Sequence, residues 1–127
     1  MSRRRLVARN ISRGTQLAER LEDGSSFWAK FMGLMGRAAL PAGEGLWLPG
    51  ENGIHMLFMR FSIDVLFVAP PSGQDGSRRV LSLRRAVRPW RGVVWRVGGA
   101  KGVLELPVGT IDSSETAVGD QISIGRP

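Results

Sequence analysis

The amino-acid sequence predicts a mainly β domain, either an antiparallel sandwich or a barrel of seven to eight short strands with one short helix. Short apolar runs recur along the chain between clusters of Gly, Pro, Asn and Asp, which is typical of strands joined by turns. Only one stretch has helical spacing, so the alternating helices of a parallel α/β fold are missing. The 127 residues, 43% of them hydrophobic, fit a single domain over residues 1–127 with a buried core.

Two strands and the one helix are predicted in the N-terminal third of the chain. Strands at 3–10 and 15–22 flank a turn that contains Gly14, although a helix is an alternative for the second segment. Residues 25–36 form the predicted helix, because large apolar side chains recur there at helical spacing. These side chains are Phe27, Phe31, Leu34 and Met35.

The remaining two thirds of the chain are dominated by strands and turns. Strands are predicted at 45–48, 54–59, 64–68, 79–83, 93–97, 102–106 and 121–124. Between the third and fourth of these lies APPSGQDGS at 69–77, whose Pro, Gly and Asp content predicts a long loop. The predicted elements therefore favour strands that pair with their neighbours along the chain.

The central segment GIHMLFMRFSIDVLFV, residues 53–68, holds ionisable groups in an otherwise apolar run. Both faces of such a strand are apolar, which predicts burial on both sides and a break near 60–62. A buried charge is costly unless it is paired and hydrogen-bonded. We therefore expect either an ion pair between Arg60 and Asp64, or Asp64 accepting hydrogen bonds from backbone N–H groups at the bend.

Two carboxylates and the only histidine, His55, are the candidate catalytic groups. Asp64 and Glu105 lie in apolar strands and could divide acid and base roles if they face each other, with His55 as a proton shuttle. The structural alternative is that Asp64 binds backbone amides and Glu105 meets an arginine on an exposed face. No cofactor or metal is predicted, because the chain has one histidine and no cysteine.

The charge pattern raises nucleic-acid binding as another alternative. The net charge is +7, and residues 78–96 combine many arginines with two tryptophans. Arginine neutralises phosphates and tryptophan can stack on bases. The residues that would carry this function are Arg84, Arg85, Arg88, Trp90 and Arg91. Basic surfaces also serve solubility, and no RNA-binding signature accompanies the stretch.

Six segments in order resemble the prokaryotic family catalogued as Domain of Unknown Function 192. They are FMGLMGR (31–37), GEGLWL (43–48), IHMLFMRFSIDVLFV (54–68), RPWR (88–91), AKGVLELPVG (100–109) and GDQI (119–122). The resemblance covers roughly residues 5–124 and implies a mainly β sandwich or barrel of no assigned activity. The chain departs from the pattern at Ser62, where the family tends to have Pro, and it lacks the Cys that many relatives carry before the histidine.

We predict that the domain binds a small polar ligand or a protein partner in a cleft near the central segment. The predicted ligand-binding residues are His55, Met59, Arg60, Asp64, Glu105 and Arg37. A hydrolase using Asp64 or Glu105 with His55, and accessory nucleic-acid binding through 78–96, stay open as alternatives. We expect a cytoplasmic location and no membrane partner, because no apolar run could span a bilayer and the basic N-terminus lacks the apolar core of a signal peptide.

Overall fold

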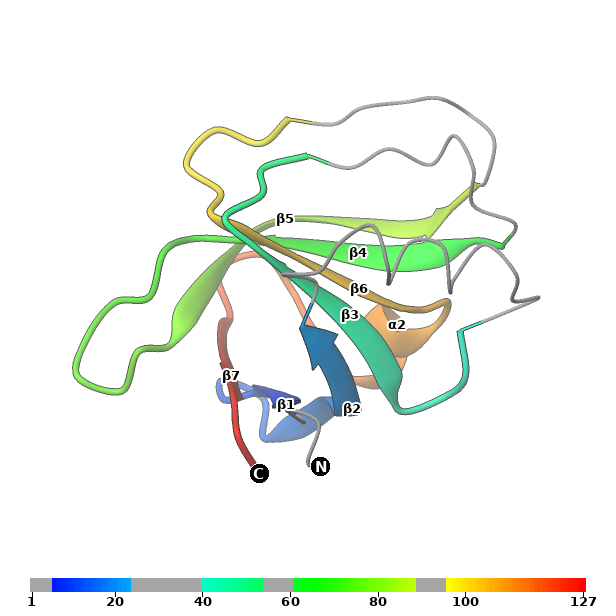
Figure 1. Cartoon of the computed structure of the whole chain (residues 1–127), viewed down its shortest axis with the longest axis horizontal. Helices are drawn as coiled ribbons and strands as arrows, with labels where there is room; N and C mark the ends of the chain where they lie inside the picture. The colour runs from blue at the N-terminus through cyan, green and yellow to red at the C-terminus, as the bar shows by residue number, and fades with distance from the viewer. Residues whose placement is uncertain (1–5, 24–39, 54–60, 89–95) are drawn as a thin grey trace.

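The computed structural model describes residues 6–23, 40–53, 61–88 and 96–127, which hold seven strands and one short helix (Figure 1). The strands are β1 (Leu6–Asn10), β2 (Thr15–Asp23), β3 (Glu44–Pro49), β4 (Ile63–Val68), β5 (Arg78–Val87), β6 (Gly102–Pro107) and β7 (Gln121–Gly125). The helix, α2, spans Thr110–Ser113 between β6 and β7.

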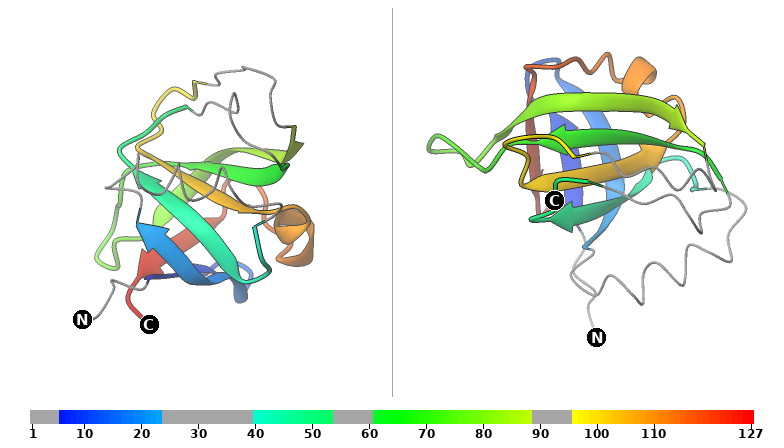
Figure 2. Two further views of the ribbon diagram at one scale, coloured as in Figure 1. Left: turned by 45° about the vertical axis from the view of Figure 1, so that its right-hand side comes forward. Right: turned by 90° about the horizontal axis from the view of Figure 1, so that it is seen from above.

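The strands close into a barrel in the order β1-β2-β3-β6-β4-β5-β7. Within the described ranges every pair is antiparallel except β2 with β3, which run parallel. Figure 2 shows β1, β2 and β7 crossing the sheet formed by β3, β6, β4 and β5. The predicted mainly β fold is thus confirmed, and of the two predicted architectures the barrel is the observed one.

Most strand predictions agree with the structure within a residue or two. The largest difference is β5, predicted at 79–83, which continues to Val87 because it pairs with β4 from Val80 to Val87. Helix α2 was not predicted, since four residues are too short to show a helical period. The predicted helix at 25–36, the strand at 54–59 and most of the strand at 93–97 lie outside the described residues; Arg96 and Val97, at its end, are not in a strand.

Two apolar layers lie on the two sides of the sheet. The barrel interior takes side chains from all seven strands and from α2, among them Leu21, Leu66, Val80, Leu104 and Ile122. The outer face of the sheet carries a second buried layer, whose main members are Leu46, Leu48, Ile63, Val65, Phe67 and Val103. All six residues of β4 are buried, so the predicted burial of the central segment on both sides is confirmed for this strand.

A network of buried polar groups joins the β1–β2 hairpin to the segment before β7. The Asp120 carboxylate accepts hydrogen bonds from the Asn10 amide at 3.0 Å, the Arg13 guanidinium at 3.1 Å and the Ala117 backbone N–H at 3.0 Å. Burial alone would raise the pKa of Asp120, but these donors outweigh it and hold the pKa below its ordinary 3.8. Asn10 also donates to Thr116, so the network is internally satisfied and serves to close the barrel.

A tryptophan fills the barrel interior near the start of β6. Trp47 lies against Gly102, where an added Cβ atom would come within 2.1 Å of the indole ring. The Arg78 guanidinium lies 4.8 Å from the centre of this ring, a cation–π distance. Arg78 also donates to the backbone carbonyls of Ala69 and Lys101, so its side chain is held by contacts within the fold.

Candidate functional site

Asp64 is a structural carboxylate. It is buried on β4, and its side chain accepts three backbone hydrogen bonds: from Ala86 N at 2.9 Å, Gly109 N at 3.1 Å and Ile111 N at 3.0 Å. The expectation that Asp64 binds backbone amides is therefore confirmed, but the donors lie on β5 and at the start of α2 rather than at the bend near 60–62. Its other predicted partner, Arg60, lies outside the described residues. The three donors use both carboxylate oxygens, so Asp64 ties β5 and the start of α2 to the central strand.

The segments that Asp64 binds have unusual backbone conformations. Ala86, near the end of β5, has a φ of 50°, a left-handed conformation that costs free energy for a residue with a Cβ atom. Gly109, before α2, has a φ of 97° and has no side chain that could cap the helix. The carboxylate of Asp64 supplies the missing acceptor from another strand, which explains a buried charge at this point of the sequence.

Glu105 lies on the other face of the sheet. It alternates along β6 with the interior residues Leu104 and Leu106, and in register it stands between Leu46 of β3 and Val65 of β4. Glu105 and Asp64 therefore project from opposite faces and do not form the facing pair that a two-carboxylate mechanism requires. Because Glu105 is only 7% exposed, the expectation that it lies on an exposed face is wrong. Arg37 and Arg60, which were expected to pair with Asp64, Glu105 or Glu44, lie outside the described residues.

The Glu105 carboxyl is a buried acid in an apolar layer. Burial raises its pKa from an ordinary 4.5 to about 7. Among the described residues, no hydrogen bond or ion pair joins the Glu105 carboxyl to another group. Buried polar groups are almost always hydrogen-bonded, and a titratable group without such a partner marks a candidate functional site. At neutral pH this group exists in both forms, so it can accept or donate a hydrogen bond.

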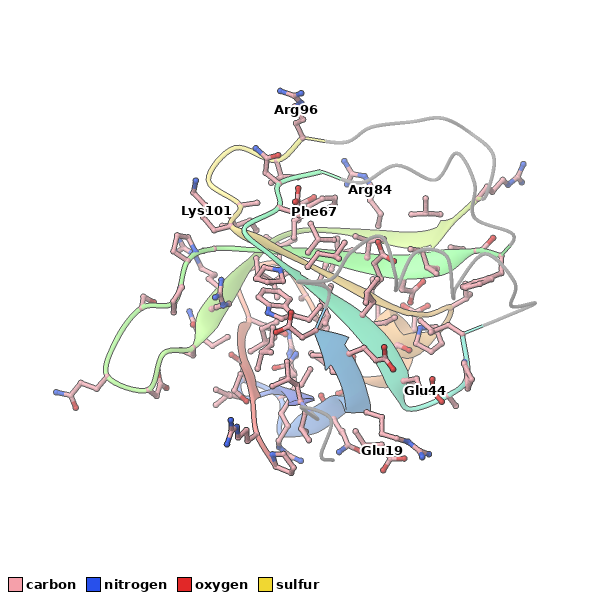
Figure 3. The ribbon with its side chains drawn as sticks, in the orientation of Figure 1. Glu19, Glu44, Phe67, Arg84, Arg96 and Lys101 are labelled. Carbon is pink, nitrogen blue, oxygen red and sulfur yellow. The ribbon has the colours of Figure 1, made fainter. Side chains whose placement is uncertain are left out.

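By register, the charged residues Arg84 and Glu44, both labelled in Figure 3, lie on the same face of the sheet as Glu105. Arg84 of β5 is in register with Val65, which separates it from Glu105, and Glu44 begins β3 two residues before Leu46. Each has interaction partners of its own. The outer face therefore presents a central carboxyl surrounded by aliphatic side chains, with one basic and one acidic residue at its sides.

Several residues proposed from the sequence lie outside the described part of the chain. These are Arg37, His55, Met59, Arg60, Trp90 and Arg91. Of the basic residues proposed for nucleic acid, Arg85 forms a 2.8 Å ion pair with the exposed Asp112, and Arg84 donates to the Leu83 carbonyl. Arg88 is exposed after the end of β5. The structural role of Arg78, also in this basic stretch, gave no sequence signal because it depends on the distant Trp47.

The described residues give no support for a metal centre. No three His, Cys, Asp or Glu side chains among them lie close enough to bind one ion. In the same ranges, no helix is long and apolar enough to cross a membrane.

The unfolding free energy should depend on pH through Glu105. Between pH 4.5 and 7 the folded protein retains a proton that the unfolded chain releases, so stability falls as pH rises through this range, by up to about 3 kcal/mol. Above pH 7 the loss is complete. Glu105→Gln removes the titration, and its stability relative to the wild type should rise between pH 5 and pH 8.

Urea unfolding of both proteins at several pH values measures this difference. Glu51→Gln, at an exposed position, is the control and should follow the wild type at every pH. Parallel stability curves for Glu105→Gln and the wild type would show that Glu105 does not titrate in this range.

Comparison with known proteins places the chain in a family. The DUF192 family, described as "Uncharacterized ACR, COG1430", matches residues 9–124. The chain belongs to the DUF192 family. The predicted resemblance is therefore confirmed over nearly the whole chain, including β4, β6 and the loop that binds Asp64.

Relatives of this DUF192 chain include UPF0127 proteins of Thermococcus sibiricus and Pyrococcus furiosus. A UPF0127 protein of Thermococcus sibiricus is 39% identical over 117 residues, which cover 89% of this chain and 71% of that protein. A second, from Pyrococcus furiosus, is 30% identical over 124 residues, covering 92% and 97% respectively. Both carry the name of an uncharacterised family.

Two solved structures share the fold of this DUF192 domain. A protein of unknown function from Novosphingobium aromaticivorans has a TM-score of 0.69 and 24% identity, covering 94% of this chain and 83% of that one. A protein from Sinorhizobium meliloti, described as a candidate transcription regulator, has a TM-score of 0.68 and 20% identity, covering 94% and 91%. At these identities the likeness concerns the fold alone.

Proposed function

We propose that this DUF192 domain binds a small ligand on the outer face of the sheet, with Glu105 as the polar anchor. The observation that carries the proposal is a carboxyl that is buried in an apolar layer and has no hydrogen-bonding partner among the described residues. Desolvating such a group costs free energy, and only its small exposed surface can contact water. A ligand that hydrogen-bonds to the carboxyl recovers it, which gives the position a functional reason.

The surroundings of Glu105 are apolar and buried, so a ligand would reach the carboxyl through the 7% of the residue that is exposed. Leu46 and Val65 flank the carboxyl in register, and Val103 precedes it on the same face of β6. Ligand sites combine such apolar walls with a few polar groups that set orientation. Asp64 leaves the proposed ligand set because its oxygens already bind three backbone N–H groups. Arg37, His55, Met59 and Arg60 stay proposed contacts.

A thermal-shift screen of small polar and amphipathic compounds tests the proposal. Binders should raise the melting temperature of the wild type, because a ligand that binds only the folded state stabilises it. Glu105→Gln should lose most of the shift, whereas the exposed control Glu51→Gln should keep it. Binders that stabilise Glu105→Gln as well as the wild type would place the site elsewhere.

Hydrolysis is a second proposal, with one catalytic carboxyl instead of two. Asp64 and Glu105 lie on opposite faces, so a single carboxyl, that of Glu105, is left to act with His55. A carboxyl with a pKa near 7 suits general acid–base catalysis at neutral pH. Hydrolase activity that survives Glu105→Gln would contradict this role. The cytoplasmic location predicted from the sequence also stays part of the proposal.

Nucleic-acid binding is the weaker alternative. Arg84 and Arg88 lie on or just after β5 and are exposed, which favours it, and one structural neighbour is described as a candidate transcription regulator. Arg85 and Arg78 are engaged within the fold, which reduces the charge available. Binding through this stretch should weaken steeply with salt. Absence of binding at low salt, or flat salt dependence, would reject it.

A further inference from the structure

We propose that the open edge of β5 binds an acidic peptide, which adds to the sheet as an extended strand. The open edge is defined here as the side of β5 that faces away from β4, from Leu83 to Ala86. It is separate from the Glu105 carboxyl, because β4 lies between β5 and β6 in the barrel.

Closure of the barrel leaves most of this edge without a partner strand. β4 pairs with β5 from Val80 to Val87, but β7 pairs only with Arg78 and Arg79 at its start. The segment before β7 adds two hydrogen bonds to the backbone of Val80, at 2.8 and 2.9 Å. Among the described residues, no strand pairs with the edge beyond this point. In the right-hand view of Figure 2, β4 runs along one side of β5, and none of the drawn strands runs along the other. An unpaired strand edge of this kind is a template for another strand.

The open edge is accessible to solvent. Arg84, Arg85 and Ala86 are exposed in succession, after the half-buried Leu83. The Arg84 guanidinium donates to the Leu83 carbonyl at 3.0 Å in an exposed hydrogen bond, which indicates that this carbonyl points away from β4. The ion pair of Arg85 with Asp112 leaves 52% and 70% of the two side chains exposed, so α2 does not cover the edge. An added strand, which lies about 4.8 Å from its neighbour, therefore has space beside β5.

The charge of β5 favours an acidic peptide. Its sequence, RRVLSLRRAV, has four arginines and no acidic residue, and Arg88 is exposed directly after it. Opposite charges on neighbouring strands stabilise their pairing, and like charges directly opposite each other destabilise it. Arg84 already has interaction partners. The attraction of a peptide carboxylate therefore depends on the positive charge of this edge and not on a missing partner.

A second copy of the chain and a nucleic acid fit the open edge less well. Antiparallel pairing of two β5 edges would place Arg84 and Arg85 of one copy close to the same arginines of the other, and their like charges disfavour it. Nucleic acid could contact the arginines, but it has no alternating backbone N–H and C=O groups to continue the sheet. An extended acidic peptide matches both the charge and the hydrogen-bonding groups of the edge.

Fluorescence polarisation with the full chain and a labelled short peptide of alternating Glu and Val tests the proposal. In a strand these residues face opposite sides, so Glu can meet Arg84 while Val packs toward Leu83. The wild type should bind, and so should the control Arg79→Glu, because Arg79 lies where β7 pairs with β5. Affinity should fall about tenfold in Arg84→Glu, and equally for a peptide with Lys in place of Glu.

A peptide with a central Pro separates strand addition from simple charge attraction. Proline has no backbone N–H, so this peptide should bind about tenfold more weakly although its charge is unchanged. Because the altered peptides leave the protein as it is, their results do not depend on the folding of a variant. Equal binding of the Glu and Lys peptides, or of the Pro peptide and its parent, would overturn the proposal.

Backbone hydrogen exchange measured by NMR locates the bound peptide. The N–H of Leu83 should exchange quickly in the free protein and about tenfold more slowly with saturating peptide. The N–H of Phe67, in a strand paired on both sides, should exchange slowly in both states. Slow exchange at Leu83 without peptide would show that another part of the chain or a second copy already covers the edge, and would reject the proposal. An oligonucleotide that binds through Arg84 when the peptide does not bind would assign the edge to nucleic acid instead.

Discussion

Replacing Asp64 by asparagine is expected to lower the free energy of unfolding by about 3 kcal/mol. Both carboxylate oxygens accept backbone hydrogen bonds, one from Ala86 and the other from Gly109 and Ile111. Asparagine has one acceptor oxygen, and its NH₂ group must face at least one of these donors. The variant therefore loses the charge and leaves a buried N–H without a partner.

Urea unfolding at pH 7 measures this loss, with Asp112→Asn as the matched control. Asp112 keeps 70% of its side-chain surface exposed and forms one ion pair with Arg85, so its replacement should change stability by less than about 1 kcal/mol. Equal effects of the two substitutions would show that the three hydrogen bonds of Asp64 do not stabilise the fold.

Gly102→Ala is the second substitution with a large expected effect, a destabilisation of about 3 kcal/mol. The added Cβ atom would lie 2.1 Å from the Trp47 ring, well inside contact distance. Trp47 is buried in the barrel, and Arg78 covers its ring, so the indole has little room to move. Relief would require a shift of β3 or β6, which pair with each other, and β6 also pairs with β4.

Gly125→Ala is the control for this substitution. Gly125 also lies in a strand, and a Cβ atom there would meet nothing within 4 Å, so its replacement should be nearly neutral. Shortening the ring with Trp47→Phe should recover part of the loss in the Gly102→Ala background. Additive effects of Gly102→Ala and Trp47→Phe in a double-mutant cycle would contradict a direct clash.

The strand pattern was predictable because it is local. Alternation and turn residues indicated the central segment, and β4 begins at Ile63, directly after the break expected near 60–62. Its apolar residues on both faces predicted burial on both sides, which the structure confirms. The parallel pairing of β2 with β3 was not predictable, because the residues between them, from 24 to 43, have no pattern that specifies which edge β3 joins.

The sequence indicated both acidic residues of the candidate site, but it did not distinguish their surroundings. Asp64 and Glu105 look alike in the sequence, each a single acid in an apolar strand. Asp64 meets the backbone of Ala86 and Ile111, which are 22 and 47 residues away. Glu105 has only the aliphatic neighbours Leu46 and Val65 in register, so one acid is structural and the other is the proposed ligand anchor. This difference depends on which strands pair and in what register.

The sequence by itself determined the class of fold, because hydrophobic alternation and turn chemistry act over a few residues and need no distant partner. It also determined that a few ionisable groups would be buried. Only the tertiary structure decided which face each acid occupies and what stands beside it, since the groups that bind a buried carboxyl, or that surround it with apolar side chains, are brought near by folding. Closure of the barrel brings these residues together.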